Sequence, residues 1–180
     1  MIEIRRLERA DLPALLGVID RSEHVDVQYA VVDGQLVERP VVMADIPPWY
    51  SDGDDEHSVQ SMVRFCESVV DDHASVILGA YVDGEVGGVA IVVPSFEPPM
   101  AWFAVLHVSR AHRRHGAASA LWAACEDLAR ESGATTMYVS ATSTGSAVGF
   151  YLSRGCRLAD PVHPALFELE PVDIHLVLDL

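Results

Sequence analysis

The segment RAHRRHGAA, residues 110–118, concentrates positive charge in a strongly acidic chain. The 180-residue sequence has a formal net charge of -15 and no lysine, yet three of its arginines lie between positions 110 and 114. An apolar run precedes the segment, and a pattern of helical period follows it from Ala117. The first N–H groups of a helix lack intrahelical partners, and the helix dipole adds partial positive charge there. Because Gly116 and the alanines after it leave room for phosphate oxygens, the segment predicts an anion site; a solvated basic loop is the simpler alternative.

Two common nucleotide-binding patterns are absent from the sequence. GxxxxGK[ST] cannot occur in a chain without lysine, and GxGxxG is not found. The anion site is therefore not that of a P-loop nucleoside triphosphatase.

Two motifs carry a resemblance to a known family. The pattern R-x-x-G-x-A at Arg113, Gly116 and Ala118 resembles the acyl-CoA motif Q/R-x-x-G-x-G/A of the GCN5-related N-acetyltransferases (GNAT). Residues 146–156, SAVGFYLSRGC, are similar to that family's segment A-x-x-F-Y-x-x-x-G-F; the matching positions are Ala147, Phe150, Tyr151 and Gly155. Two positions depart from the family pattern. Thr144 stands where an asparagine is frequent, and Cys156 replaces the last phenylalanine.

The resemblance implies acetyl-CoA as co-substrate, bound between two splayed parallel strands, FAVLHV and MYVSA. The pyrophosphate would lie on the loop 113–118, and the backbone of 106–108 would pair with the pantetheine amides, because an extended ligand can satisfy unpaired strand groups. The cofactor-binding residues expected on this basis are Leu106, His107, Val108, Arg113, Arg114, His115, Gly116, Ala117, Ala118, Thr144 and Tyr151.

Acyl transfer from a thioester to an amine needs a neutral amine and a proton for the departing thiolate. Tyr151 is the predicted general acid, because a phenol of pKa about 10 is protonated at neutral pH. The alternative is that its ring only packs beside Phe150. His107 is the only titratable residue on its strand and is the candidate general base. Two alternatives remain: strand alternation could turn His107 into the core as a structural histidine, and a water chain relayed by backbone carbonyls could take the proton without any particular residue.

The acceptor pocket is expected to include residues from 24–57, a segment that matches no part of the family pattern. There, Trp49 and Tyr50 could form an apolar wall, and the acids Asp54, Asp55 and Glu56 could attract an amine. The plainer interpretation is a solvated acidic loop beside two partly buried aromatic rings. His163, Glu168 and His175 are assigned no role.

We interpret the chain as an acetyl-CoA-dependent N-acetyltransferase that transfers the acetyl group to a small-molecule or peptide primary amine by direct attack in a ternary complex. The alternative is a non-catalytic acyl-CoA-binding or regulatory module of the same fold. It is motivated by the lack of a carboxylate on the strand MAWFAVLHV and by Thr144.

The elements that must position these residues follow the local patterns. Strands are expected at 2–6, 100–108 and 135–141, and hairpins turn at Asp33-Gly34 and Asp83-Gly84. Helices are expected at 11–22, at 58–70 with Ser58 as the cap, from 117 to a stop at Gly133, and at 146–153; LFELEPVDIHLVLDL is read as a final strand. The resemblance implies an α/β (α+β) fold in one domain, 1–180. Its mixed, mostly antiparallel sheet has splayed parallel strands 4 and 5 and is flanked by helices.

Composition restricts the remaining functions. A pI near 4.7 disfavours nucleic-acid binding, and no apolar run approaches the length of a membrane span, about 18 residues. Three cysteines, odd in number and far apart, indicate neither a disulfide framework nor a metal site. Because the start resembles no signal peptide, we expect a cytoplasmic protein. The oligomeric state is open, with a homodimer among the alternatives.

Overall fold

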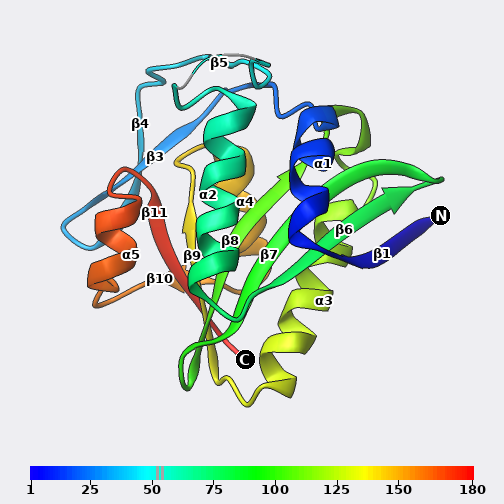
Figure 1. The fold of residues 1–180 in the computed structure, drawn as a ribbon. Helices are drawn as coiled ribbons and strands as arrows, with labels where there is room; N and C mark the ends of the chain where they lie inside the picture. The colour runs from blue at the N-terminus through cyan, green and yellow to red at the C-terminus, as the bar shows by residue number, and fades with distance from the viewer. Residues whose placement is uncertain (52, 54) are drawn as a thin grey trace.

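A seven-stranded mixed sheet organises the computed structural model, which describes residues 1–51, 53 and 55–180 (Figure 1). The strands, in spatial order, are β1 (Ile2–Leu7), β6 (Val76–Val82), β7 (Glu85–Glu97), β8 (Met100–Val108), β9 (Thr136–Ala141), β11 (Ile174–Asp179) and β10 (Arg157–Leu158). Neighbours pair antiparallel except β8 and β9, the fourth and fifth strands in this order, which pair parallel. The predicted fold class is confirmed.

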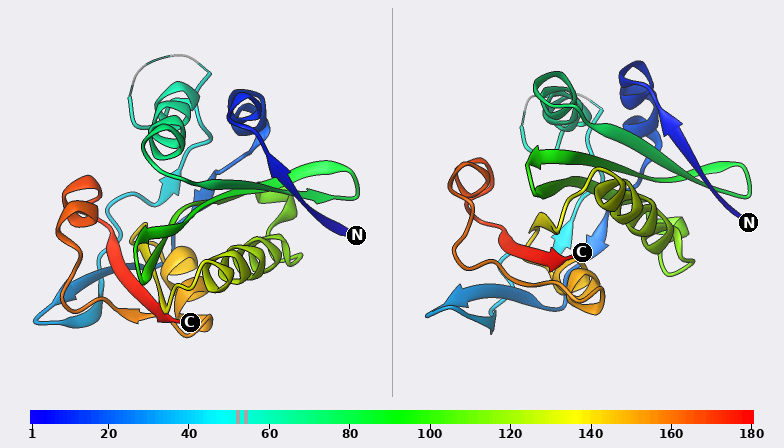
Figure 2. Two further views of the ribbon diagram at one scale, coloured as in Figure 1. Left: turned by 60° about the horizontal axis from the view of Figure 1, so that its bottom comes forward. Right: turned by 90° about the horizontal axis from the view of Figure 1, so that it is seen from below.

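Helices cover both faces of this sheet. They are α1 (Leu12–Val18), α2 (Val59–Asp72), α3 (Ala117–Glu131), α4 (Gly145–Ser153) and α5 (Pro164–Leu169). Figure 2 shows α1 and α2 on one face and α3 with α4 on the other. Each face has its own apolar core, one built around Leu12, Leu16 and Cys66 and the other around Leu121 and Trp122. None of the helices among the described residues combines the length and the apolar character needed to cross a membrane.

The central strand β7 is apolar almost throughout because both of its faces are covered. Val89 and Ile91 pack in the α1/α2 core, whereas Ala90 and Val92 pack in the α3/α4 core. Successive side chains of a strand point to opposite faces, so a strand covered on both sides needs apolar residues at every position. The sequence-based interpretation of this run is confirmed.

Both predicted hairpin turns are present. Asp33 and Gly34 have φ of 51° and 74° and join β3 (Gln28–Val32) to β4 (Gln35–Arg39). Asp83 and Gly84 have φ of 50° and 90° and join β6 to β7. Two consecutive residues with positive φ are the requirement of a tight hairpin turn, which Asp-Gly meets at low cost. A further short pair, β2 (Glu23–His24) with β5 (Asp45–Ile46), completes the segment between α1 and α2.

Two predicted boundaries were wrong. The first helix ends at Val18 rather than near residue 22, because Ile19 is already extended. The segment LFELEPVDIHLVLDL is not one strand: its first part belongs to α5, and only Ile174–Asp179 forms β11. Pro164 occupies the first turn of α5, and the His163 side chain accepts a hydrogen bond from the Leu166 N–H. This cap explains why residues whose pattern is also compatible with a strand form a helix here.

Candidate active site

The parallel strands β8 and β9 separate as predicted. Their register runs from Met100 opposite Thr136 to Phe103 opposite Val139 and stops there. Strand β8 continues to Val108, paired on its other side with β7. Among the described residues, the β9-facing edge of β8 beyond Phe103 therefore has no strand partner. This is the condition under which an extended amide-bearing ligand can add to a sheet.

The basic loop after β8 brings a helix N-terminus to this opening. Arg114 and Gly116 both adopt left-handed backbone conformations, with φ of 62° and 93°, and Gly116 is the N-cap of α3. The first intrahelical bond runs from the Ala120 N–H to the Gly116 carbonyl at 2.9 Å. The N–H groups of residues 117–119 precede it, so they are available to an anion, as the sequence predicts.

The arginines of this loop differ in role. The Arg113 guanidinium donates to the carbonyl oxygens of Val108 and Arg21, at 3.1 and 2.8 Å, and lies 3.4 Å from a carboxylate oxygen of Glu23. It therefore ties the end of β8 to the segment after α1. Arg114 is exposed and forms no ion pair with any residue that the structure describes. The charge of the Arg114 guanidinium is therefore available to an anion.

A pocket of about 400 Å³ joins the basic loop, the free edge of β8 and α4. Nine of the predicted cofactor residues line it: Leu106, His107, Val108, Arg113, Arg114, Gly116, Ala118, Thr144 and Tyr151. His115 is exposed and Ala117 is buried beneath the helix start, and neither side chain lines the pocket. Residues that the sequence analysis did not select also line it: Arg21, Glu23, Ile46, Ser119, Thr142 and Ser146. Arg21, Glu23 and Ile46 come from a distant segment with no local motif, whereas Ser119, Thr142 and Ser146 lie within or beside the two motif segments.

The Tyr151 side chain reaches the pocket from α4. Its ring packs against Phe103, Trp122 and Phe150, with ring centroids 5.3–6.2 Å apart. No described residue is hydrogen bonded to its hydroxyl. Burial, together with the nearby Cys156, raises the pKa of Tyr151 above its usual range. The phenol is therefore protonated at any physiological pH, which is the state that a general acid requires.

His107 lies on the α1/α2 face of β8. Its ring meets the Trp49 ring edge-on, with centroids 4.7 Å apart. Burial, and then the charges of Arg21 and Arg113, lower the pKa of His107 to about 4. The imidazole is neutral at pH 7 but a weak proton acceptor, which makes it poorly suited to the general-base role.

Thr144, the departure from the family pattern, has a structural task. It is 3% exposed and caps α4, its hydroxyl accepting from the Ala147 N–H at 3.4 Å. Ser or Thr is among the preferred residues at this position of a helix. The substitution for asparagine thus keeps the start of α4 in place beside the pocket.

The segment between α1 and α2 contributes Trp49 and Arg21 to the α1/α2 face of the opening. The Arg21 guanidinium lies over the Trp49 ring at 5.5 Å and is hydrogen bonded to His57 Nδ1 at 2.6 Å. Tyr50 is 46% exposed and the Asp55 carboxylate accepts from the His57 N–H. Asp54, predicted to attract an amine, lies outside the described residues.

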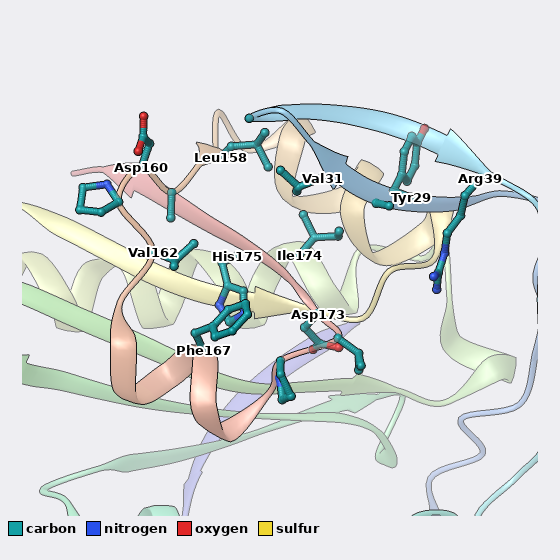
Figure 3. A pocket seen from close by; sticks show the side chains of 16 residues that line it. Tyr29, Val31, Arg39, Leu158, Asp160, Val162, Phe167, Asp173, Ile174 and His175 are labelled. Atoms are coloured by element: carbon teal, nitrogen blue, oxygen red, sulfur yellow. The ribbon is translucent and has the colours of Figure 1, made fainter.

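A second pocket, of about 730 Å³, opens between the β3–β4 hairpin and the C-terminal segment. Figure 3 shows Tyr29 and Val31 of the hairpin on one side and Phe167, Asp173 and His175 on the other. The sequence analysis did not anticipate it, because the hairpin residues and the C-terminal residues that line it are at least 119 positions apart.

Two carboxyl groups beside this pocket are unusual. Burial raises the pKa of Asp173 to about 6, and burial together with the charge of Asp173 raises the pKa of Glu170 to about 7. No described basic residue forms an ion pair with either of them. Neither residue was selected from the sequence.

These raised pKa values predict a loss of stability as pH rises. Both folded-state pKa values lie above the pKa values of the unfolded chain, so the two neutral carboxyl groups contribute their full stability below about pH 4. This contribution is lost as pH rises through 6–7. Replacing Glu170 by glutamine should raise Tm by a few degrees at pH 8 and leave it nearly unchanged at pH 4.5. Differential scanning calorimetry at the two pH values measures this difference. The matched control is Glu168→Gln, an exposed position on the same helix; an equal response in both variants would contradict the prediction.

Comparison with known proteins identifies a family model and a set of solved structures. The model described as the acetyltransferase (GNAT) family matches residues 41–156. Both motifs, at 113–118 and 147–155, lie inside this range. A search of curated proteins returned no match.

The solved structures show the same fold over nearly the whole chain. Nourseothricin acetyltransferase is 21% identical, with a TM-score of 0.71 over 99% of this chain and 98% of that one. A protein named as a streptothricin acetyltransferase from Bacillus anthracis str. Ames, solved with acetyl coenzyme A, is 16% identical, with a TM-score of 0.65 over 100% and 98%. The PaiA N-acetyltransferase of Thermoplasma acidophilum, solved with coenzyme A, is 14% identical, with a TM-score of 0.62 over 100% and 99%.

Proposed function

The chain belongs to the GNAT family of acetyltransferases, and we propose that it transfers the acetyl group of acetyl-CoA to a primary amine by direct attack in a ternary complex. One observation carries the proposal: a single pocket joins a helix N-terminus beside Arg114, the unpaired edge of β8 and Tyr151. These are the parts needed for the pyrophosphate, the pantetheine and the thioester, arranged along one channel.

The residues of the pocket fit coenzyme A in the order of its parts. The N–H groups at the start of α3 and the Arg114 guanidinium would hold the pyrophosphate. The backbone of 106–108 would pair with the pantetheine amides, although the Val108 carbonyl already accepts from Arg113. The thioester would then lie beside Tyr151, whose neutral phenol supplies the proton for the departing thiolate.

Direct attack needs no cysteine nucleophile, and the cysteines are unsuited to that role. All three are buried and free. Burial raises the pKa of Cys156, the one that follows α4, to about 12. Since the thiolate is the reactive form, this thiol is inert at neutral pH.

The proposed function is tested by offering acetyl-CoA and a panel of primary amines to the protein. Acetyl transfer is monitored through release of the CoA thiol and through mass spectrometry of the product. The panel should include nourseothricin and streptothricin, after which two of the solved relatives are named. We expect product only when acetyl-CoA and an amine are both present. Tight binding of acetyl-CoA without transfer to any amine would support the non-catalytic module instead.

We further propose a cationic acceptor, small or peptide-sized, that is steered by the negative field of the chain. The formal charge of -15 and the acids Asp54, Asp55 and Glu56 motivate this. If steering operates, kcat/KM should fall several-fold as ionic strength rises from 0.02 to about 0.3 M, because salt screens long-range attraction. Replacing the three acids by Asn, Asn and Gln should flatten this dependence and leave kcat nearly unchanged.

The matched control removes the same charge elsewhere, at the exposed acids Glu38, Asp127 and Glu131. If the acidic loop steers the acceptor locally, this control keeps most of the salt dependence. A kcat/KM that does not respond to salt in the parent enzyme, or a preference for uncharged acceptors, would contradict the cationic class.

A further inference from the structure

The pocket between the β3–β4 hairpin and the C-terminal segment, here called the hairpin pocket, has no part in the proposed acetyl transfer. None of the residues that line it also lines the pocket assigned to coenzyme A. Its volume of about 730 Å³ lies in the range of small-molecule sites, about 300–1,000 Å³. The cavity therefore has room for an organic ligand, and the chemistry of its lining indicates the class.

Both walls of the hairpin pocket are tied to the sheet. On the hairpin side, the Tyr29 N–H donates to the Ser143 carbonyl at 2.8 Å, and the Arg39 guanidinium donates to the Ser143 hydroxyl at 3.4 Å. On the C-terminal side, the Ala159 N–H donates to the His175 carbonyl at 3.0 Å. The cavity is thus preformed by hydrogen bonds within the fold, as small-molecule sites usually are.

Most of the lining is apolar, and part of it is left uncovered by the fold. Val31, Val162 and Phe167 line the pocket and are 47, 41 and 44% exposed. The Phe167 ring lies against the His175 ring, with centroids 5.4 Å apart, and adds a flat surface to the wall. Covering such a concave apolar surface is favourable, so the lining selects a ligand with an apolar body.

Asp173 adds a carboxylate without a partner to this apolar lining. In the view of Figure 3 its side chain lies between Phe167 and Arg39. No described residue donates a hydrogen bond to the carboxylate or forms an ion pair with it. Burial raises the pKa of Asp173 to about 6, which shows that its charge is poorly solvated. A cation bound in the pocket would supply the missing partner.

The other charges around the hairpin pocket also favour a cation over an anion. Asp160 is a second acid in the lining, and the charge of Asp173 reaches Glu170 beside it. Burial lowers the pKa of His175, so its ring is neutral at neutral pH. Arg39 is the one positively charged side chain among the lining residues, and it is exposed. The acids therefore outnumber the base at this site.

We propose that the hairpin pocket is a binding site for an organic amine, whose apolar or aromatic body covers Val31, Val162 and Phe167 and whose ammonium group pairs with Asp173. The site goes beyond the proposed acetyl transfer and does not depend on it. Two sources can supply this chemistry: an amine that the protein acetylates, or a separate amine that binds without reacting.

The first test compares three probes of nearly equal shape: phenylethylamine, phenylethanol and phenylpropionate. Their affinities are measured by protein-observed NMR titration at pH 8, without acetyl-CoA, so that the result is independent of any reaction. We expect the amine to bind at least about 10-fold more tightly than the alcohol, since a charged hydrogen bond is gained. The acid should bind most weakly. Equal affinities for the amine and the alcohol would overturn the ammonium class.

Two variants assign the contacts within the pocket. Asp173→Asn should weaken the amine about 10-fold or more and leave the alcohol nearly unchanged, because only the charge pair is lost. Phe167→Ala should weaken the amine and the alcohol by similar factors. Glu168→Gln removes an exposed acid from the same helix as Phe167 and should change neither affinity. Undiminished amine binding in Asp173→Asn would overturn the role of Asp173.

The last measurement locates the probe and distinguishes its two sources. Saturating CoA should leave the amine affinity within a few-fold, because the two pockets share no residue; displacement of the amine by CoA would overturn the proposed location. Acetyl-CoA is then added and the probe is analysed by mass spectrometry. An acetylated probe supports the acceptor as the natural ligand, and an unmodified probe that still binds supports a separate amine. Absence of acetylation with every amine contradicts the proposed function alone.

Discussion

Replacing Gly116 by aspartate is expected to abolish CoA binding while the protein stays folded. Gly116 is the N-cap of α3 and has φ of 93°, a conformation that aspartate tolerates better than most residues. Its nearest neighbour, Ile2 Cδ1, would lie 3.4 Å from an added Cβ, so there is space for the side chain and the strain comes from the positive φ. The carboxylate would cap the helix and occupy the position of the pyrophosphate with a like charge. Isothermal titration calorimetry with CoA measures the loss.

The matched control is Gly116→Asn, which has the same shape and the same tolerance of positive φ without the charge. We expect the asparagine variant to bind CoA more weakly than the parent and the aspartate variant not to bind at all. The difference between them isolates electrostatics from bulk. Unchanged affinity in the aspartate variant would refute the anion-site interpretation of the basic loop.

Replacing Tyr151 by phenylalanine should lower kcat about 10²-fold or more and change acetyl-CoA affinity only a few-fold. The ring contacts with Phe103, Trp122 and Phe150 remain, so packing is kept. No described residue is hydrogen bonded to the hydroxyl, so its removal leaves no polar group of the described residues unsatisfied. The loss therefore reports on proton donation. Steady-state kinetics and calorimetry separate turnover from binding.

Tyr138→Phe is the control for this variant. Its hydroxyl accepts from the His163 N–H at 3.2 Å, on the other face of the sheet, so the change should affect stability more than turnover. Full activity in the Tyr151 variant would show that the thiolate leaves unassisted or that another group donates the proton.

The sequence by itself determined the features that depend on short stretches of chain. The Asp-Gly turns, the Ser58 cap and the alternation in β7 follow from preferences of neighbouring residues, and the structure confirms each. The loop 110–118 could be interpreted for the same reason, because an arginine, a glycine and a helix start within nine residues are enough to predict an anion site. The family and its chemistry followed from two such local motifs.

The tertiary structure alone decided which of these residues are free to act. Arg113 and Arg114 are neighbours in sequence, but only Arg113 is bound to Glu23 and to backbone of two segments, and this leaves Arg114 for a ligand. Glu170 has no motif around it, and its pKa depends on burial against β9 and on Asp173. The contacts of Arg113 with Arg21 and Glu23 join residues 92 and 90 positions apart. Their strength comes from exclusion of water, which no local pattern encodes.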